Sequence, residues 1–227
     1  VPADLIIPWW VDKIESGFYD CPTVRTITFQ GSIELGTGAF AGCPNLESVY
    51  FLAYSEVTLG ECCFDGCRNL SLVSGLKVAD SRDGGFAFRG TAYWNSLPDG
   101  FVINNSWLIG YKGECPMEVV IPDAVKFIGG CVFYEAGMHS VKMHDGVKII
   151  GRSAFARSKL RTVEWSKGLE TIGAGAFGNT ELEMAILPSS VTTVGDEAFR
   201  ECNSLKTLVA PSGETVFWQH ALMGVCS

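Results

Sequence analysis

Cysteine and histidine are the residues of this chain whose types and spacing could carry chemistry. The sequence holds nine cysteines and three histidines. An odd number of cysteines leaves at least one thiol free or paired between molecules. Four cysteines follow a phenylalanine in the same phrase, Phe-x-x-Cys: Cys21, Cys43, Cys67 and Cys202. They could form disulfides, hold a metal ion, or fill a tight turn as small buried hydrophobes, and the repetition favours the buried thiols.

Metal binding and catalysis have weaker support. Cys62, Cys63 and Cys67 lie close together, but no distant CxxC pair would complete a zinc site. Cys131 with His139 or His144 would be a nucleophile and its base, yet Cys131 lies two residues before a phenylalanine predicted to be in the core. Hydrolase, zinc-protease, Walker and dinucleotide motifs are absent. The sequence therefore predicts no enzyme, no catalytic residue, no metal and no cofactor.

A repeat of 22 to 24 residues must position these side chains. Its phrase, Gly-x-x-x-Phe, recurs at Gly36–Phe40, Gly60–Phe64, Gly129–Phe133, Gly151–Phe155, Gly173–Phe177 and Gly195–Phe199. A fixed period of this size is typical of a solenoid, in which one short unit is stacked repeatedly. Because the core of a solenoid builds no single pocket, binding along a surface is the expected function.

Each repeat has two halves. After the phenylalanine come apolar residues that end in alternation, as in Leu46, Val49 and Phe51, which predicts a short parallel strand with one buried face. The Gly-x-x-Ala-Phe half is predicted to be a short turn of helix or irregular chain, with glycine where φ is positive or backbones approach closely. The predicted class is an α/β solenoid: a right-handed coil with a parallel sheet on one face and short helical or irregular turns on the other.

The phrases IGRSAFARSKLRTVEW, LGTGAFAGCPNLESVYF and IGAGAFGNTELEMAILPSSVTTVGDEAFRECNSLKTL resemble the BspA-like leucine-rich repeat family. The resemblance covers most of residues 14–210. It implies a leucine-rich-repeat solenoid, a secreted or cell-surface location, and a role in binding proteins. It carries over no catalytic residue.

The chain is predicted to be one domain, 1–227. Residues 1–13 are predicted to be an N-terminal cap, because their apolar side chains would cover the open end of the solenoid. Repeats follow at 14–90 and 122–211, and residues 212–227 are predicted to be a C-terminal cap. Between the repeats, 91–121 is predicted to be an inserted β-hairpin that turns at Asn104-Asn105-Ser106, with apolar arms on both sides.

A protein-binding surface is predicted on the outward positions of the strands. Met184, Ile186 and Val209 in adjacent coils would form an exposed apolar patch, which commonly marks a protein interface. The patch would be rimmed by Arg161, Glu164 and Lys206. The predicted surface residues are Glu47, Tyr50, Arg161, Glu164, Met184, Ile186 and Lys206.

The alternative function is carbohydrate binding through exposed aromatic rings, with Trp9, Trp10, Trp94 and Trp107 as its residues. For Trp9 and Trp10 the competing interpretation is the N-terminal cap. For Trp94 and Trp107 it is a hairpin segment that merely continues the sheet.

Composition limits the partners. Asp and Glu outnumber Lys and Arg by 25 to 17, and the formal charge is −8. Nucleic-acid binding rests on clustered basic residues, so the charge argues against it, as it does against an anionic membrane surface. No apolar run reaches the ~18 residues of a membrane-spanning helix. The expected partner is another protein, with polysaccharide as the alternative. The chain begins at Val1 without a signal peptide and is interpreted as a segment of a longer protein.

Overall fold

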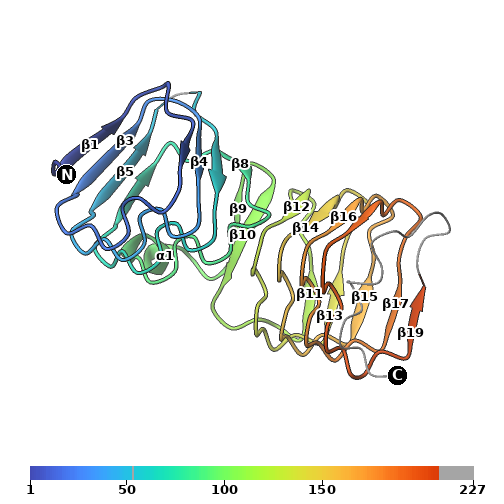
Figure 1. Cartoon of the computed structure of the whole chain (residues 1–227). Coiled ribbons are helices and arrows are strands. Elements are labelled where there is room, and N and C mark those ends of the chain that lie inside the picture. Colours follow the sequence, from blue (N-terminus) through green and yellow to red (C-terminus); the bar gives the residue numbers. More distant parts are fainter. Residues whose placement is uncertain (53, 210–227) are drawn as a thin grey trace. The chain divides into compact units, whose positions relative to one another are not determined.

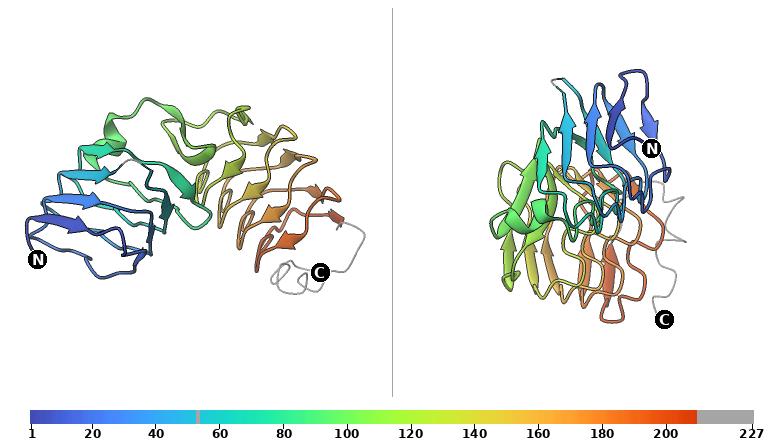
Figure 2. Two further views of the ribbon diagram at one scale, coloured as in Figure 1. Left: turned by 90° about the horizontal axis from the view of Figure 1, so that it is seen from above. Right: turned by 90° about the vertical axis from the view of Figure 1, so that its left-hand side faces the viewer.

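The computed structural model describes residues 1–52 and 54–209 of the chain (Figure 1). These residues form a β-solenoid of stacked parallel strands in two compact units, one that ends at Pro98 and one that begins at Asp99, called here the first and the second unit. Within each unit, successive coils stack on one another (Figure 2). The single domain and its internal boundaries stay a prediction. The predicted C-terminal cap, 212–227, lies outside the described residues.

The first unit has two parallel sheets. One contains β1 (Asp4–Ile7), β3 (Thr26–Phe29), β5 (Ser48–Phe51) and β7 (Leu72–Ser74), in that order. The other contains β2 (Lys13–Ile14), β4 (Ile33–Leu35), β6 (Val57–Leu59) and β8 (Val78–Asp80). Residues 1–13 therefore supply the first strand of a sheet, since β1 pairs with β3 along its whole length. The short helix α1 (Ala92–Ser96) ends this unit, and the Thr91 side chain caps its N-terminus.

The second unit repeats the arrangement. One sheet has the order β18-β16-β14-β12-β10-β9, and the opposite strands form a three-stranded and a two-stranded sheet. The first sheet contains β9 (Gly100–Asn104), β10 (Trp107–Lys112), β12 (Phe127–Ile128), β14 (Ile149–Ile150), β16 (Thr171–Ile172) and β18 (Thr193–Val194). The others are β11 (Glu118–Val120), β13 (Ser140–Lys142) and β15 (Thr162–Glu164), and β17 (Met184–Ile186) with β19 (Thr207–Val209).

The sequence pattern does not predict the second run of short strands in each unit. It shows only pairs of apolar residues before each glycine, such as Val191 and Val194, and strands of two or three residues are too short to alternate visibly. In the structure these pairs face the core, and their strands pair in parallel from coil to coil. Burial on this second side is what closes each coil around its core.

The recurring phenylalanines form one ladder in each unit. In the first unit the rings of Phe18, Phe40, Phe64 and Phe88 stack at centroid distances of 4.9, 5.6 and 5.5 Å. In the second, Phe133, Phe155, Phe177 and Phe199 stack at 5.3, 5.2 and 5.4 Å. Stacked rings exclude water from both faces and add to the burial of each side chain. Seven of these eight rings are buried, which confirms the core position predicted for Phe133, and Phe18 at the end of the first ladder is partly buried.

The turns that carry the ladder are irregular and hold the coils together through their backbones. The amide of each ladder phenylalanine donates to the carbonyl just before the next ladder phenylalanine, as from Phe155 to Ala176 at 2.8 Å and from Phe40 to Cys63 at 2.8 Å. In the described part of the chain the one helix is α1, with five residues. The α/β class is therefore not confirmed: the turns bond both from coil to coil and between residues three apart, as from Ala156 to Ser153, and they form no helix. The handedness of the coil stays a prediction.

Close backbone approach explains the opening glycine in four of the six phrases, at Gly36, Gly60, Gly173 and Gly195. A Cβ on Gly173 would lie 2.6 Å from the carbonyl carbon of Gly151 in the preceding coil, and one on Gly60 would meet the Leu35 carbonyl oxygen. Of the two reasons given from the sequence, close approach applies here. The positive φ angles lie instead two residues before and two after the ladder phenylalanines, as at Gly38 (63°) and Gly42 (72°).

Strands β9 and β10 pair antiparallel around Asn105 and Ser106, whose φ angles are 48° and 66°. Two successive residues with positive φ are the signature of a tight two-residue hairpin turn. Strand β10 also pairs in parallel with β12, so it continues the sheet of the second unit. That this segment is an insertion into the repeats stays a prediction.

Candidate binding surfaces

The strand face of the second unit is the outward side of β11, β13, β15, β17 and β19. Alternate residues of these strands point to solvent because the pleat gives successive side chains opposite directions. One outward row contains Glu118, Ser140 and Thr162 in register, and continues with Met184 and Thr207. The other contains Val120, Lys142 and Glu164, and continues with Ile186 and Val209. The predicted outward positions of Glu164, Met184 and Ile186 therefore agree with the structure.

Met184, Ile186 and Val209 are exposed by 54%, 51% and 45% and lie on the paired strands β17 and β19, with Ile186 opposite Val209. We call these three residues the apolar strand patch. Other exposed apolar residues on the outward rows stand apart. Val120 lies on β11, and β13 and β15 follow it in the three-stranded sheet, while Ile6 and Leu72 of the first unit are separated by β3 and β5. On these rows, the exposed apolar side chains of the patch thus lie next to one another.

Charged side chains border the patch, and most are held in exposed ion pairs. Arg161 bonds Glu181 at 2.8 Å, and Glu164 bonds Lys142 at 2.8 Å. Lys206 is exposed next to β19. Exposed ion pairs contribute little to folding stability. Replacing such a pair by one with a ligand's charged group therefore costs little free energy. The structure thus brings Arg161, Glu164, Met184, Ile186 and Lys206 into one unit and onto consecutive coils.

Tyr50 and Glu47 belong to the first unit. Tyr50 lies half-buried on β5, in register with Thr28 on β3 and Ser74 on β7. Glu47 precedes the strand and lies 4.0 Å from Arg25. This strand face is mainly polar, in contrast to the apolar strand patch.

The four tryptophans proposed for carbohydrate binding do not form one platform. Trp107 is 3% exposed, which corrects its predicted role: it begins β10, and its ring packs at 4.9 Å on Phe127, its register partner in β12. Trp9 and Trp10 are 71% and 67% exposed, but their rings meet edge to face at 5.6 Å and offer no common flat surface. Trp94 lies partly buried on α1 of the first unit.

The repeated thiols lie in the turns and are bonded. Cys43, Cys67 and Cys202 are buried, and each donates to the carbonyl of the ladder phenylalanine one coil earlier, at 3.1, 3.0 and 3.0 Å. Within residues 1–52 and 54–209 no disulfide joins the cysteines. The hydrogen bond between the two thiols raises the pKa of Cys67 and lowers that of Cys43, while burial raises the pKa of Cys63. Cys43, Cys67 and Cys202 are thus buried thiols that bond the backbone of the turns.

Of the two histidines considered as a base for Cys131, His144 is held by the backbone of its own turn. Both ring nitrogens of His144 bond the backbone: the Gly146 amide donates to Nδ1 at 3.1 Å, and Nε2 lies 2.9 Å from the Val125 carbonyl oxygen. His144 therefore has a structural role in its turn. His139 contributes its backbone to the strands around β13. Across the described ranges, no three Cys, His, Asp or Glu side chains are grouped to hold a metal ion.

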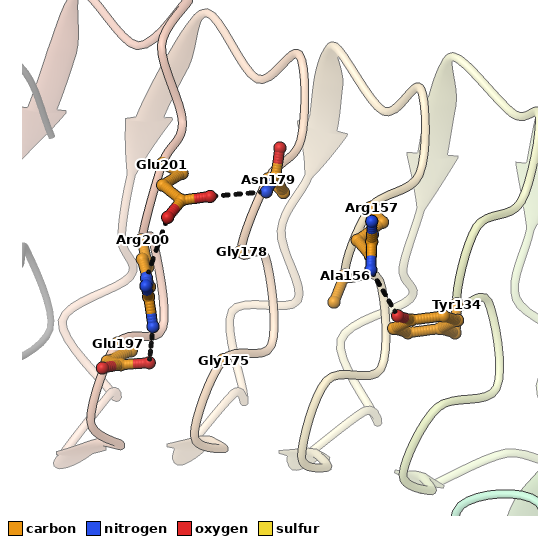
Figure 3. A pocket seen from close by; sticks show the side chains of 9 residues that line it. All are labelled: Tyr134, Ala156, Arg157, Gly175, Gly178, Asn179, Glu197, Arg200 and Glu201. Atoms are coloured by element: carbon orange, nitrogen blue, oxygen red, sulfur yellow. Dashed lines mark hydrogen bonds and ion pairs between the residues drawn. The ribbon is translucent and has the colours of Figure 1, made fainter. Parts of the chain in front are cut away.

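A shallow groove of about 210 Å³ lies on the turn side of the second unit (Figure 3). The residues that follow the ladder phenylalanines form its axis: Tyr134, Ala156, Gly178 and Arg200. Ala156 and Gly178 are small and lie between the large side chains of Tyr134 and Arg200, which leaves the groove open. Sequence reasoning missed this site, although aligning the repeats on their phenylalanines would have shown the small pair.

The repeats of this chain match a known protein family. Residues 3–82 and 111–226 match the family model of the BspA type leucine rich repeat region, in six copies. No curated protein matches the chain. In the part that the structure describes, no helix has both the length and the apolar character to cross a membrane.

Several solved bacterial structures are similar to the chain. The pneumococcal vaccine antigen PcpA shares 19% identity over 92% of this chain and 72% of its own, with a TM-score of 0.50. A leucine rich cell surface protein from Faecalibacterium prausnitzii shares 16% identity over 99% of this chain and 92% of its own, with a TM-score of 0.46. At such identities the likeness to PcpA concerns the fold. Because the family model covers well over half of the sequence, the chain belongs to the BspA-type leucine-rich repeat family.

Proposed function

We propose that this chain is a non-enzymatic protein-binding or adhesion module of a secreted or cell-surface protein, and that its partner binds the strand face of the second unit. The apolar strand patch carries this proposal. Three apolar side chains about half exposed on two paired strands lose free energy in water that a partner would recover by covering them.

The surroundings of the patch fit a protein partner. Interfaces have an apolar centre and a polar rim, and Arg161, Glu164 and Lys206 supply charges of both signs beside the patch. The expected partner surface presents apolar side chains with charged groups at its edge. Tyr50 and Glu47 remain proposed contacts on the strand face of the first unit. The secreted or cell-surface location is part of the proposal and rests on the family.

The test uses a variant that copies one of the chain's own repeats. Strand β13 carries Ser140 and Lys142 where β17 carries Met184 and Ile186, so the double variant Met184→Ser, Ile186→Lys uses residues that this backbone already accepts. The matched control is Ile6→Lys, which makes the same apolar-to-charged change on β1 of the first unit. Thermal unfolding checks that all three proteins fold alike.

Surface and secreted extracts are passed over the immobilised chain, and each captured protein is identified, purified and measured by calorimetry. We expect the double variant to lose at least about tenfold in affinity for the partner, and Ile6→Lys to bind as the wild type does. Equal affinity of wild type and double variant would remove the patch from the proposal. If no purified protein binds the chain, the protein-binding function itself fails.

A further inference from the structure

The groove on the turn side of the second unit is built from consecutive repeats and has a fixed polar lining. Arg200 lies between two carboxylates: Nη1 donates to Glu197 at 3.0 Å and Nε to Glu201 at 3.1 Å. The Asn179 amide donates to Glu201 at 2.7 Å (Figure 3). Because these side chains hold one another, they are ordered before any ligand arrives, which lowers the entropic cost of binding.

The backbone directs these side chains to the groove. Glu197, two residues before a ladder phenylalanine, and Asn179 and Glu201, two residues after one, have φ angles of 59°, 61° and 55°. A left-handed conformation at residues other than glycine costs free energy, and such strain clusters at functional positions. Each coil thus presents a polar side chain where a glycine would be the easier choice.

The charges of the groove cancel. Its lining includes two arginines, Arg157 and Arg200, and two glutamates, Glu197 and Glu201. A lining of this kind favours neither an anion nor a cation. Within the described part of the chain, the bonds given above leave Nη2 of Arg200 as a donor, and one oxygen each of Glu197 and Asn179 as acceptors. A neutral ligand with several hydroxyl groups satisfies both kinds, since each hydroxyl donates and accepts.

An aromatic ring and a small floor complete the site. Tyr134 stands at one end of the groove, with its hydroxyl accepting from Arg157 at 3.2 Å, and Ala156, Gly175 and Gly178 line the groove beside it. An amphipathic ring can pack against the C–H face of a ligand whose hydroxyls reach the polar side chains. At about 210 Å³ the groove is smaller than the roughly 300–1,000 Å³ of drug-sized sites, so it fits a single ring.

We propose that this groove binds a neutral sugar, one residue of a saccharide, between the Tyr134 ring and the side chains of Asn179, Glu197 and Arg200. The site is separate from the tryptophans considered above and from the apolar strand patch. The column of residues is different in the first unit, where it reads Tyr19, Ala41, Asp65 and Arg89, and Arg89 donates Nε to Asp65 at 2.9 Å. Only one small residue remains in that column. The hollow on the turn side of that unit is lined instead by Gly42, Pro44, Gly66, Arg68 and Asn69.

The first experiment is a titration of the isotope-labelled wild-type chain with neutral saccharides, followed by amide chemical shifts. The probes are glucose, galactose, mannose and N-acetylglucosamine, each with a di- and a tetrasaccharide. We expect saturable shifts for at least one series, with a dissociation constant on the order of 1 mM, centred on Ala156, Gly178, Asn179 and Arg200. Shifts centred on Trp9 and Trp10, or no saturable shift with any probe, would overturn the proposal.

Two variants test the assignment, with a control from the other unit. Ala156→Tyr fills the groove with the side chain that the preceding coil already carries as Tyr134, and we expect it to abolish binding. Tyr134→Ala removes the ring and is expected to weaken binding about tenfold. The control Ala41→Tyr makes the same change in the corresponding column of the first unit and should bind as the wild type does. Undiminished binding by Ala156→Tyr contradicts the proposed site, whatever the behaviour of Tyr134→Ala.

Discussion

The two units have equivalent phenylalanine ladders, but the carbonyls of these phenylalanines accept hydrogen bonds from different side chains. In the first unit, Cys43 and Cys67 follow their phenylalanines by three residues and reach back to the phenylalanine carbonyl of the preceding coil. In the second, Ser158 and Thr180 hold the same position and donate to the carbonyl of their own phenylalanine, at 2.7 and 2.9 Å. In the first unit Thr91, after the last ladder phenylalanine, makes this kind of bond too, at 2.8 Å. These carbonyls also accept the backbone amide three residues on, as Phe18 does from Cys21 and Phe155 from Ser158, so in both units the side chain adds a second hydrogen bond to the carbonyl.

The length of the turn decides which donor is used. Leu46 follows Phe40 by six positions, whereas Leu160 follows Phe155 by five. Cys202 confirms the rule within the second unit: its turn has the longer form, and its thiol again reaches back one coil. The longer turns of the first unit also add an amide bond between coils, from Asn45 to the Pro22 carbonyl and from Asn69 to that of Pro44, each at 2.7 Å.

The positions two residues after the ladder phenylalanines separate the units most clearly. All have positive φ, but three of the four in the first unit are glycine: Gly42, Gly66 and Gly90. The four in the second unit are Glu135, Arg157, Asn179 and Glu201. Because glycine adopts this conformation without strain, the first unit saves backbone energy there. The second unit gains polar side chains on its turn face, which the groove uses.

The largest expected effect concerns what the two units share. Phe64 and Phe155 are both fully buried and stacked on two neighbours, so Phe64→Ala and Phe155→Ala should each lower the free energy of unfolding by about 3–5 kcal/mol. Urea unfolding gives the loss, and amide hydrogen exchange shows which unit opens. A twofold difference between the variants would show that the two ladders are not equivalent.

The next effect tests the close approach of the backbones. Gly60→Ala and Gly173→Ala each place a Cβ against backbone of the preceding coil, which cannot rotate away, so each should cost about 1–3 kcal/mol. Gly17→Ala in the first unit and Gly137→Ala in the second are the controls, because a Cβ there meets nothing within 4 Å. Thermal unfolding compares the stability of the four variants with that of the wild type. Equal behaviour of variants and controls would contradict the explanation given for the phrase.

A smaller effect is expected from the turn donors. Thr180→Val keeps the shape of the side chain but removes its hydroxyl, and Cys67→Ala removes the thiol, so each should cost about 1 kcal/mol. Hydrogen exchange should show the loss in the second unit for Thr180→Val and in the first for Cys67→Ala. If either variant is as stable as the wild type, the corresponding bond does not hold the turn.

The smallest effect at neutral pH, and the one most specific to the first unit, comes from Cys63. Burial raises the pKa of this thiol above its unfolded value of about 8.5, so the folded chain keeps the proton longer. Stability is fully present below that pH and falls as pH rises above it. Cys63→Ala installs the residue found at this position as Ala39 and Ala176. The variant should lose less stability than the wild type from pH 8.5 to 10, measured by urea unfolding at each pH; parallel losses would contradict this role.

Local patterns predict much of the fold. The alternation in Leu46, Val49 and Phe51 places these side chains in the core, and the outward positions follow from it, including those of Met184 and Ile186. The prediction for Trp107 is wrong because an apolar arm of a hairpin does not reveal which side a neighbouring strand will cover. Strand β12 packs Phe127 against it, and that pairing spans twenty residues.

The sequence by itself determined the repeat, the phenylalanine ladder and the family, because each coil depends on residues close together in the chain and the pattern recurs. Only the tertiary structure decided what lies between coils. The thiol of Cys67 bonds a carbonyl 27 residues earlier, and the groove depends on Tyr134, Gly178 and Arg200 from three different coils. Stacking of the coils brings these residues together, so their contacts cannot be predicted from the sequence of a single repeat.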